Sequence, residues 1–324
     1  MVITAPSIER SSNGPRPINL NKDIPQVLSL LRLAFGESLD AEGKRILQGQ
    51  TAVTGQPAIF YRFNPMASRL ARGFVWEQDG QIIGNVTLLN TTVNGRFIIV
   101  NVAVHPDYRR QGIARLLMKH TLDHVRQQNG RETLLQVDKD NQNAIDLYAD
   151  LGYTTVGTMT SWIASAGRAH SLQSHANIPI RKLRGDESQA AYELDILALS
   201  PNLNWPEPIP KDTYQSGLWK RFSNFINARS HESWITTNGR YLTGSISIWS
   251  EWGRAHHLTL RVHPKWKGEL ERPLLAKILH QLPYMPRRSV RIDHPHDDDL
   301  TTALLTEANF KPKRTLTHMH LNLR

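Results

Sequence analysis

The sequence predicts an α/β chain made of two similar domains, each with a mixed, largely antiparallel sheet flanked by helices. Strand-like and helix-like apolar runs alternate along the 324 residues, and short sequence patterns recur about 158 residues apart. A polar stretch rich in Ser, Gly, His and Gln separates the two copies. We therefore expect a disordered leader over 1–15, a first domain over 16–164, a linker over 165–177 and a second domain over 178–324.

The repeat is carried by four pairs of matching segments. In each copy a Val-His-Pro segment precedes an apolar helical run, and each has an upstream hairpin and a downstream helix that leads into an aromatic residue. Asp-Gly and Asn-Gly mark the hairpin turns, because both central positions of the favoured turn need positive φ. The matching pairs are Val104–Tyr108 with Val262–Trp266, Arg115–Lys119 with Pro273–Lys277, the hairpins turning at Asp79-Gly80 and Asn238-Gly239, and Leu147–Tyr153 with Leu304–Phe310.

The elements can be placed in order. Ile113, Leu116, Leu117 and Val125 indicate the buried face of the helix that begins near Ile113, and Asn129-Gly130 is a plausible stop. The first half predicts a strand at 17–20, a helix at 24–35, a hairpin at 74–89, a strand at 97–104, that helix, a strand at 134–137 and a further helix and strand. The second half repeats this order with a strand at 180–183, a helix at 187–199 and a hairpin at 234–249.

Composition excludes several classes of protein. The chain has no cysteine, which excludes disulfides, thiolate catalysis and Cys-ligated zinc. It has no apolar run long enough to span a membrane and no signal peptide, so we expect a cytoplasmic protein. The net charge of +10 is scattered, which makes nucleic acid an unlikely partner and fits an anionic cofactor or substrate. The His and Asp residues of 294–299 match no recognised metal site, so no metal is expected.

The segment 102–114, VAVHPDYRRQGIA, is suited to binding a pyrophosphate. A buried strand ends at His105-Pro106, and a loop then runs directly into a helix. A helix N-terminus presents unpaired N–H groups and a positive partial charge. Gly112 allows close approach of the backbone to an anion, and Arg109 and Arg110 add positive charge. The alternative, a relaxed turn with solvated arginines, fits this strand–loop–helix context less well.

These residues resemble the GNAT superfamily of acyl-CoA N-acyltransferases. Its loop motif, Gln/Arg-x-x-Gly-x-Gly/Ala, is filled by Arg109, Gly112 and Ala114. Its second motif, Asn-x-x-Ala-x-x-Leu-Tyr-x-x-x-Gly-Tyr/Phe, is matched over Asn141–Tyr153. The second half resembles the same fold with degenerate motifs, so the whole chain resembles a tandem-domain member.

The resemblance implies the site residues. Backbone groups of the strand end would pair with the pantetheine arm, and one amide there would polarise the thioester carbonyl. Tyr148 would protonate the departing thiolate, although a half-buried packing role is the alternative. Asn141 would bind the pantetheine or cap a helix. The implied acetyl-CoA-binding residues are Val102, Ala103, Val104, Arg109, Arg110, Gln111, Gly112, Ile113, Ala114, Arg115, Asn141 and Tyr148.

The general base is not identified by the sequence. Many members of the family place a Glu on the strand before the loop, but residues 98–101 here are Ile-Ile-Val-Asn. Loss of the proton through water, or to Glu77 or His105, remains open.

The second half is expected not to bind the cofactor. In the alignment Leu270 stands opposite Gly112 and Arg272 opposite Ala114, and Glu269 and Glu271 would crowd and repel a pyrophosphate. Leu305 stands opposite Tyr148 and Asp298 opposite Asn141.

The function that follows is an acetyl-CoA-dependent N-acetyltransferase with one working site. The acceptor would be a primary amine of a small molecule or of a protein, attacked on the thioester without a covalent enzyme intermediate. The alternatives are an acetyl-CoA-binding regulator or scaffold without turnover, and transfer of a longer acyl or aminoacyl group.

Overall fold

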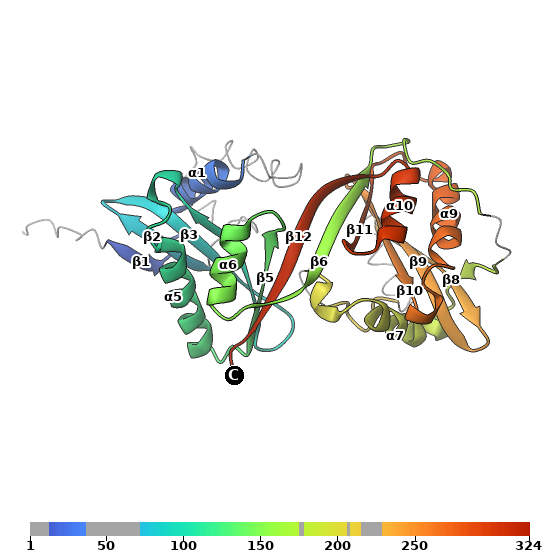
Figure 1. The fold of residues 1–324 in the computed structure, drawn as a ribbon, viewed down its shortest axis with the longest axis horizontal. Coiled ribbons are helices and arrows are strands. Elements are labelled where there is room, and N and C mark those ends of the chain that lie inside the picture. The colour runs from blue at the N-terminus through green and yellow to red at the C-terminus, as the bar shows by residue number, and fades with distance from the viewer. Residues whose placement is uncertain (1–12, 37–71, 175–177, 206–207, 215–228) are drawn as a thin grey trace, which may run out of the picture. The chain divides into compact units, whose positions relative to one another are not determined.

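The structure, a computed structural model, describes residues 13–36, 72–174, 178–205, 208–214 and 229–324 (Figure 1). The chain divides into two compact units that do not coincide with the two halves of the sequence. Unit 1 comprises Met1–Gln136, Asn143–Thr154 and His320–Arg324, and unit 2 comprises Val137–Gln142 and Thr155–Met319. The last five residues of the chain are therefore part of the unit that contains the N-terminal half.

Unit 1 has the predicted mixed sheet. Its strand order is β1-β2-β3-β4-β5, with antiparallel pairing except for the parallel pair β4–β5. The elements are β1 (Gly14–Pro17), α1 (Ile24–Phe35), β2 (Gly73–Gln78), β3 (Gln81–Asn90), β4 (Arg96–Val104), α5 (Ile113–Gln127), β5 (Glu132–Asp138) and α6 (Gln142–Asp150).

Unit 2 repeats this arrangement. Its strands follow the order β12-β6-β11-β10-β9-β8-β7, and β10–β11 is the parallel pair that corresponds to β4–β5. The elements are β6 (Thr154–Ala164), β7 (Arg181–Lys182), α7 (Ser188–Ala198), β8 (Arg229–Asn238), β9 (Tyr241–Glu251), β10 (His256–Val262), α9 (Glu271–Gln281), β11 (Val290–Pro295), α10 (Asp299–Glu307) and β12 (Lys311–Asn322).

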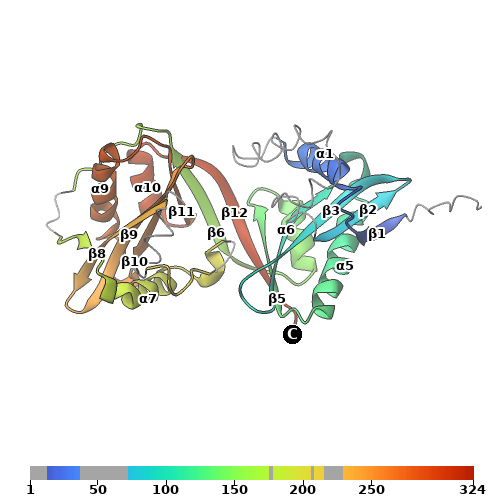
Figure 2. The same ribbon diagram turned by 180° about the vertical axis from the view of Figure 1, so that it is seen from behind.

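Helices cover both faces of each sheet, because consecutive residues of a strand point to opposite faces. In β2, Val75 packs against α1, whereas the ring of Phe74 contacts His120 of α5 at 4.6 Å. In β8, Ile235 packs in the cluster formed with α7, and Trp234 packs in the main core with α9 and α10. The figures show α1 and α5 on either side of the unit 1 strands (Figures 1 and 2).

The first predicted hairpin is confirmed, and the second is displaced by one residue. Asp79 and Gly80 both have positive φ, 51° and 79°, as a type I′ turn requires. In the second hairpin Asn238 pairs with Tyr241, so the two-residue loop is Gly239-Arg240. Only Gly239 has positive φ there, the pattern of a type II′ turn. The Asn-Gly dipeptide marked the hairpin correctly but not the turn positions.

Several predicted boundaries can be compared with the structure. The helix at 24–35 is confirmed. Of the predicted leader, residues 1–12 lie outside the described part, but Gly14 and Pro15 pair with β2 as part of β1. The described part of the predicted linker belongs to unit 2, where Leu172 is buried in the main core. The predicted buried face of α5 is wrong at Leu116, which is 48% exposed, because the apolar stripe runs through Leu117, Met118 and Leu122 instead.

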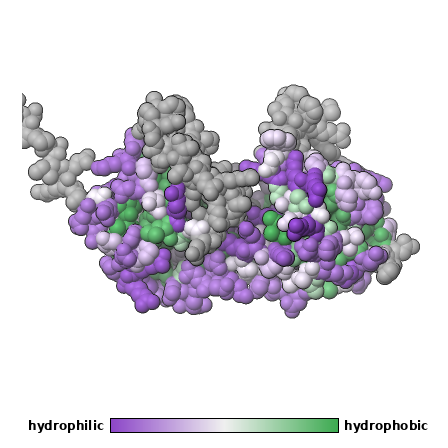
Figure 3. All heavy atoms as spheres, turned by 90° about the horizontal axis from the view of Figure 1, so that it is seen from above, coloured by the Kyte–Doolittle hydropathy of each residue, from purple (hydrophilic) through white to green (hydrophobic). Residues whose placement is uncertain are grey.

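The described surface is mostly hydrophilic in the view of Figure 3. Among the described residues, no helix is both long enough and apolar enough to cross a membrane.

Candidate active site

Strand β4 separates from β5 halfway along its length. Parallel pairing begins at Arg96 with Glu132 and ends at Ile99 with Leu135. On its other edge β4 carries a bulge, because Thr87 of β3 faces Val100 while Asn85 faces Ala103, leaving two residues of β4 opposite one of β3. A bulge bends a strand and increases its twist. The end of β4, Val102–Val104, is therefore an open edge rather than part of a ladder with β5.

Buried polar side chains hold this bulge. Asn101 adopts a left-handed backbone conformation with φ 55°, which Asn tolerates better than most residues. The Nδ2 group of Asn85 donates to Asn101 O at 2.9 Å, and the Nδ2 group of Asn101 donates to Thr87 Oγ1 at 3.3 Å. Asn85 and Thr87 are each 1% exposed. These residues were not predicted from the sequence, although two polar residues inside the apolar run 81–90 were a usable signal.

The loop after β4 presents unpaired backbone amides. After a short 3₁₀ turn at Pro106–Tyr108, Arg110 and Gly112 both have positive φ, 61° and 79°. Gly112 is the N-cap of α5, and the first helical hydrogen bond is Leu116 N–H to Gly112 O. Within the described residues, the N–H groups of residues 111–115 have no backbone acceptor. A Cβ added at Gly112 would meet no atom of the described residues within 4 Å, so no described side chain covers the start of α5 on this side.

These unpaired amides, the cradle, can bind an anion. They lie at the positive end of a 15-residue helix, and the exposed Arg109 and Arg110 belong to the same loop. The Nε group of Arg109 donates to Val104 O at 3.3 Å, which ties the loop to the open end of β4.

The corresponding loop in unit 2 is one residue shorter than the sequence alignment assumed. Leu270 and Leu274 pack over Gly244 as Ile113 and Leu117 pack over Gly84. Leu270 is therefore the counterpart of Ile113 rather than of Gly112, and its side chain lies in the core instead of facing an anion. One positive-φ residue, Gly268, remains where the first loop has two.

Glu271 then stands opposite Ala114 and bonds to an amide of its own loop. Its carboxylate accepts the N–H of Gly268 at 2.9 Å, and the residue is 3% exposed. Strand β10 also lacks the bulge, since its pairing with β9 runs unbroken from His257 to Val262. The sequence predicted that the size of Leu270 and the charge of Glu269 would exclude a pyrophosphate. The structure shows instead a hydrogen bond within the loop, between Gly268 and Glu271.

A small pocket remains beside β10, and most of its charged groups have hydrogen-bond partners within unit 2. Arg261, on the pocket wall, donates to buried Asp195 at 2.9 Å. His294 donates to Asp298 at 2.8 Å, and Asp298 caps α10 through the Thr301 N–H. The predicted metal-like cluster is thus a histidine–carboxylate pair that caps a helix.

Arg115 pairs with Asp150 of α6 at 2.6 Å. Unit 2 contains the same contact, because Arg272 of α9 makes two hydrogen bonds to Glu307 of α10. The pair therefore recurs in unit 2, where Glu271 bonds to the loop amide of Gly268, which indicates a structural role that joins the two helices.

We expect Arg115→Gln to change acetyl-CoA affinity less than about threefold, because the guanidinium is engaged with Asp150 and loss of an exposed ion pair costs the fold little. Arg110→Gln removes the same charge from the loop itself and should weaken binding about tenfold. Isothermal titration of both variants distinguishes phosphate binding from the pairing of two helices. An equal loss of acetyl-CoA affinity in both would show that Arg115 also binds the phosphates.

Tyr148 lies on α6 in the last turn before that ion pair. It is 6% exposed, and burial raises the pKa of its hydroxyl well above the ordinary value of 10. No hydrogen bond joins this hydroxyl to a described residue, whereas the neighbouring Tyr153 hydroxyl bonds Thr133 Oγ1 at 2.7 Å. The two rings lie 6.0 Å apart. Tyr148 is therefore a neutral, uncommitted donor across the physiological pH range.

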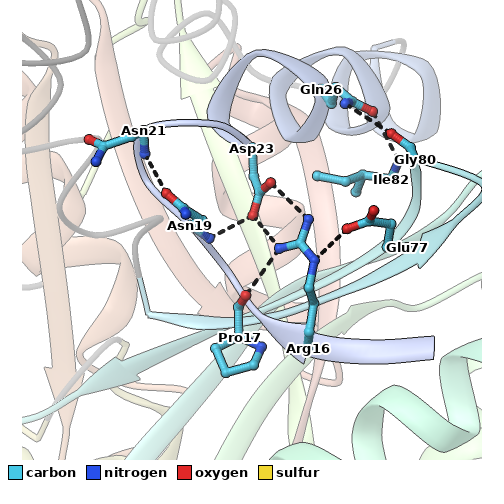
Figure 4. Close-up of polar contacts among 9 residues, drawn as sticks. All are labelled: Arg16, Pro17, Asn19, Asn21, Asp23, Gln26, Glu77, Gly80 and Ile82. Atoms are coloured by element: carbon cyan, nitrogen blue, oxygen red, sulfur yellow. Dashed lines mark hydrogen bonds and ion pairs between the residues drawn. The ribbon is translucent and has the colours of Figure 1, made fainter. Parts of the chain in front are cut away.

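Asn141 and the two candidates for the general base, Glu77 and His105, each make contacts of their own. The N–H of Asn141 donates to Asp138 O in the turn before α6, within a segment that clusters with unit 2. Glu77 accepts a hydrogen bond from Arg16, which also donates a hydrogen bond to Asp23 (Figure 4). His105 Nδ1 accepts the Asp107 N–H, and His263 makes the same contact in unit 2. Both base candidates thus have structural roles, and β4 carries no carboxylate.

The first half of the chain is similar to known acetyltransferases. Residues 43–153 match the acetyltransferase (GNAT) family. The [ribosomal protein bS18]-alanine N-acetyltransferase of Escherichia coli K12 is 40% identical over 55 residues, covering 17% of this chain and 37% of that enzyme. The peptidyl-lysine N-acetyltransferase YiaC of the same strain is 34% identical over 86 residues, 26% of this chain and 52% of that enzyme. The chain thus matches about a third to a half of the length of these curated relatives.

Two solved structures share the whole fold. A GCN5-related N-acetyltransferase from Sphaerobacter thermophilus superimposes with a TM-score of 0.61 at 15% identity, over 96% of this chain and 95% of that one. A tandem GNAT protein from the clavulanic acid biosynthesis pathway gives 0.52 at 15% identity, over 95% and 98%. The chain therefore shares the fold of these two structures, and its residues 43–153 are similar to the acetyltransferase (GNAT) family.

Proposed function

We propose that the chain is an acetyl-CoA-dependent N-acetyltransferase with one cofactor site, in unit 1. The observation that carries this proposal is the cradle of free amides at residues 111–115, placed at the open, bulged end of β4. The residues proposed to bind the pyrophosphate are Arg109–Ala114. The backbone of Val102–Val104 is proposed to pair with the pantetheine arm, because this edge of β4 has no pairing with β5.

In the proposed reaction, the acceptor nitrogen forms a bond to the thioester carbonyl carbon and the carbon–sulfur bond breaks. A backbone N–H of the β4 edge stabilises the charge that develops on the carbonyl oxygen. Tyr148 donates its proton to the departing sulfur and regains one from water. The proton lost by the amine leaves to water, since Glu77 and His105 have other contacts. Tyr148 suits this role because burial keeps its hydroxyl protonated.

The acceptor is proposed to be a primary amine of a small molecule or a protein. The names of two relatives specify an alanine of ribosomal protein bS18 and a peptidyl lysine. Those names select the first acceptors to test here.

The proposal is tested by titrating the protein with acetyl-CoA and by measuring thiol release with an alanine-ended peptide, a lysine peptide and a panel of small amines. We expect one molecule of acetyl-CoA bound per chain and release of CoA that depends on an amine. Absence of binding at micromolar concentrations contradicts the proposal. The missing carboxylate on β4 favours a second candidate, a sensor of acetyl-CoA, and tight binding without thiol release from any amine would select it.

A further inference from the structure

The last strands of the two halves are exchanged. In the sequence repeat β6 ends the first half and β12 ends the second, and β5 corresponds to β11. In the structure β6 pairs with β11, from Met159 opposite Pro295 to Ala164 opposite Val290. The neighbour of β5 is β12, which starts in unit 2 and ends in unit 1.

Contacts along β12 show that it runs antiparallel to β5. The Lys139 N–H, just after β5, donates to Thr315 O at 3.1 Å. At the opposite end, the Leu323 N–H donates to Arg131 O at 2.8 Å. Residue numbers rise along one strand as they fall along the other, so the strands are antiparallel. Because the two hydrogen bonds flank β5, β12 lies beside β5 between them.

A polar network within unit 1 then joins three adjacent strands. His320 of β12 donates to one carboxylate oxygen of Glu132 in β5 at 2.8 Å, and Arg96 of β4 donates to the other at 2.7 Å. Burial raises the pKa of Glu132, but the hydrogen bonds from Arg96 and His320 outweigh this and lower it. Arg96 and Glu132 are the first pair of the β4–β5 ladder that ends, three residues later, at the open edge.

The same segment contacts the turn that follows α6, the helix of Tyr148, and the start of β6. The Thr154 hydroxyl donates to His320 O at 3.3 Å, and Leu321 lies beside Gly152, where a Cβ would approach it to 3.3 Å. One short segment thus touches β5, its link to β4, and the turn that follows α6.

We propose that the C-terminal segment His320–Arg324 is a working part of the acetyl-CoA unit. It holds β5 against β4 where the two strands are paired, at Arg96 and Glu132. It thereby sets how far the strands separate beyond Ile99. The second half of the chain, without a cofactor site of its own, serves the first by supplying this strand. The expected effect on the affinity for acetyl-CoA rests on the proposed function, whereas the expected effect on the pairing of β5 does not.

The experiment compares the full chain with a variant that ends at Met319, by amide hydrogen exchange and by titration with acetyl-CoA. Loss of the neighbouring strand should speed exchange in the β5 peptide 132–136 at least tenfold and raise the Kd about tenfold, with β9 unchanged. Unchanged exchange in β5 overturns the proposal whatever the affinity of the full chain. Failure of the full chain to bind acetyl-CoA contradicts the proposed function alone.

Point variants keep the test valid if the shortened chain does not fold. His320→Ala should raise the Kd for acetyl-CoA and speed exchange in 132–136, and His320→Gln, which retains an N–H donor, should restore both. The matched control is His257→Ala, which removes a similar contact, 3.1 Å to Asp293, far from β5 in the strand order. Equal effects of His320→Ala and His257→Ala on β5 exchange, or no rescue by Gln, would overturn the proposal.

Discussion

Replacing Gly112 with Glu is expected to raise the Kd for acetyl-CoA at least 100-fold. Gly112 has φ 79°, where a side chain costs about 1 kcal/mol or more, and its Cβ direction opens onto the space before the amide cradle. A carboxylate there would meet the phosphates. Two unit charges about 5 Å apart repel by about 3 kcal/mol at an effective dielectric constant of about 20, a factor of more than 100 in affinity. Titration calorimetry measures this directly.

The chain offers a matched control in Gly268→Glu. Gly268 lies in the corresponding loop of unit 2, has φ 93°, and would likewise place a Cβ within 4 Å of no atom. The substitution therefore imposes the same charge and similar backbone strain. Its acetyl-CoA affinity should stay within twofold of the parent, because Glu271 already occupies the amide there. Comparable losses in both variants would show that the effect is general destabilisation rather than loss of a phosphate site.

Tyr148→Phe is expected to lower kcat about 100-fold while the Kd for acetyl-CoA changes less than twofold. General acid catalysis contributes typically about 10²- to 10⁴-fold, and removing one hydroxyl leaves the packing of the ring in place. The measurement is steady-state thiol release with any amine that proves to be an acceptor. An unchanged kcat would remove Tyr148 from the mechanism and leave it a packing residue of α6.

Tyr153→Phe is the control, since Tyr153 is also buried but its hydroxyl is committed to Thr133. This variant should lose stability and retain kcat. The pH profile adds a further check. Because burial raises the pKa of Tyr148 above 10, its protonated form persists, and kcat should show no fall from its ionisation below pH 10. A decline in kcat near pH 8 that disappears in Tyr148→Phe would contradict the proposed environment of this hydroxyl.

Much of the local structure follows from the sequence because it depends on near neighbours. The helix at 24–35 follows from a Pro in its first turn and a regular apolar stripe, and the Asp79-Gly80 turn follows from two residues that accept positive φ. The phosphate loop has the same character, since Gly112 and the helix that begins at Ile113 create the free amides over a few residues. A repeat visible in one sequence also predicted the two mixed sheets.

The rest depended on contacts between residues far apart in the chain. The bulge at Asn101 needs Asn85 and Thr87 from the adjacent strand, and the shorter loop of unit 2 is revealed only by Leu270 packing over Gly244. The pairing of Arg115 with Asp150 likewise changed the interpretation of an arginine that the motif assigned to the phosphates.

The sequence by itself determined the class of fold, the order of elements and the loop in the first half that is suited to an anion. Only the tertiary structure decided which strand completes which sheet. Backbone groups form the same hydrogen bonds whatever the side chains are, so either copy of a strand can pair with either sheet. Side chains such as His320 and Glu132, which meet only when the chain is folded, favour one pairing over the other.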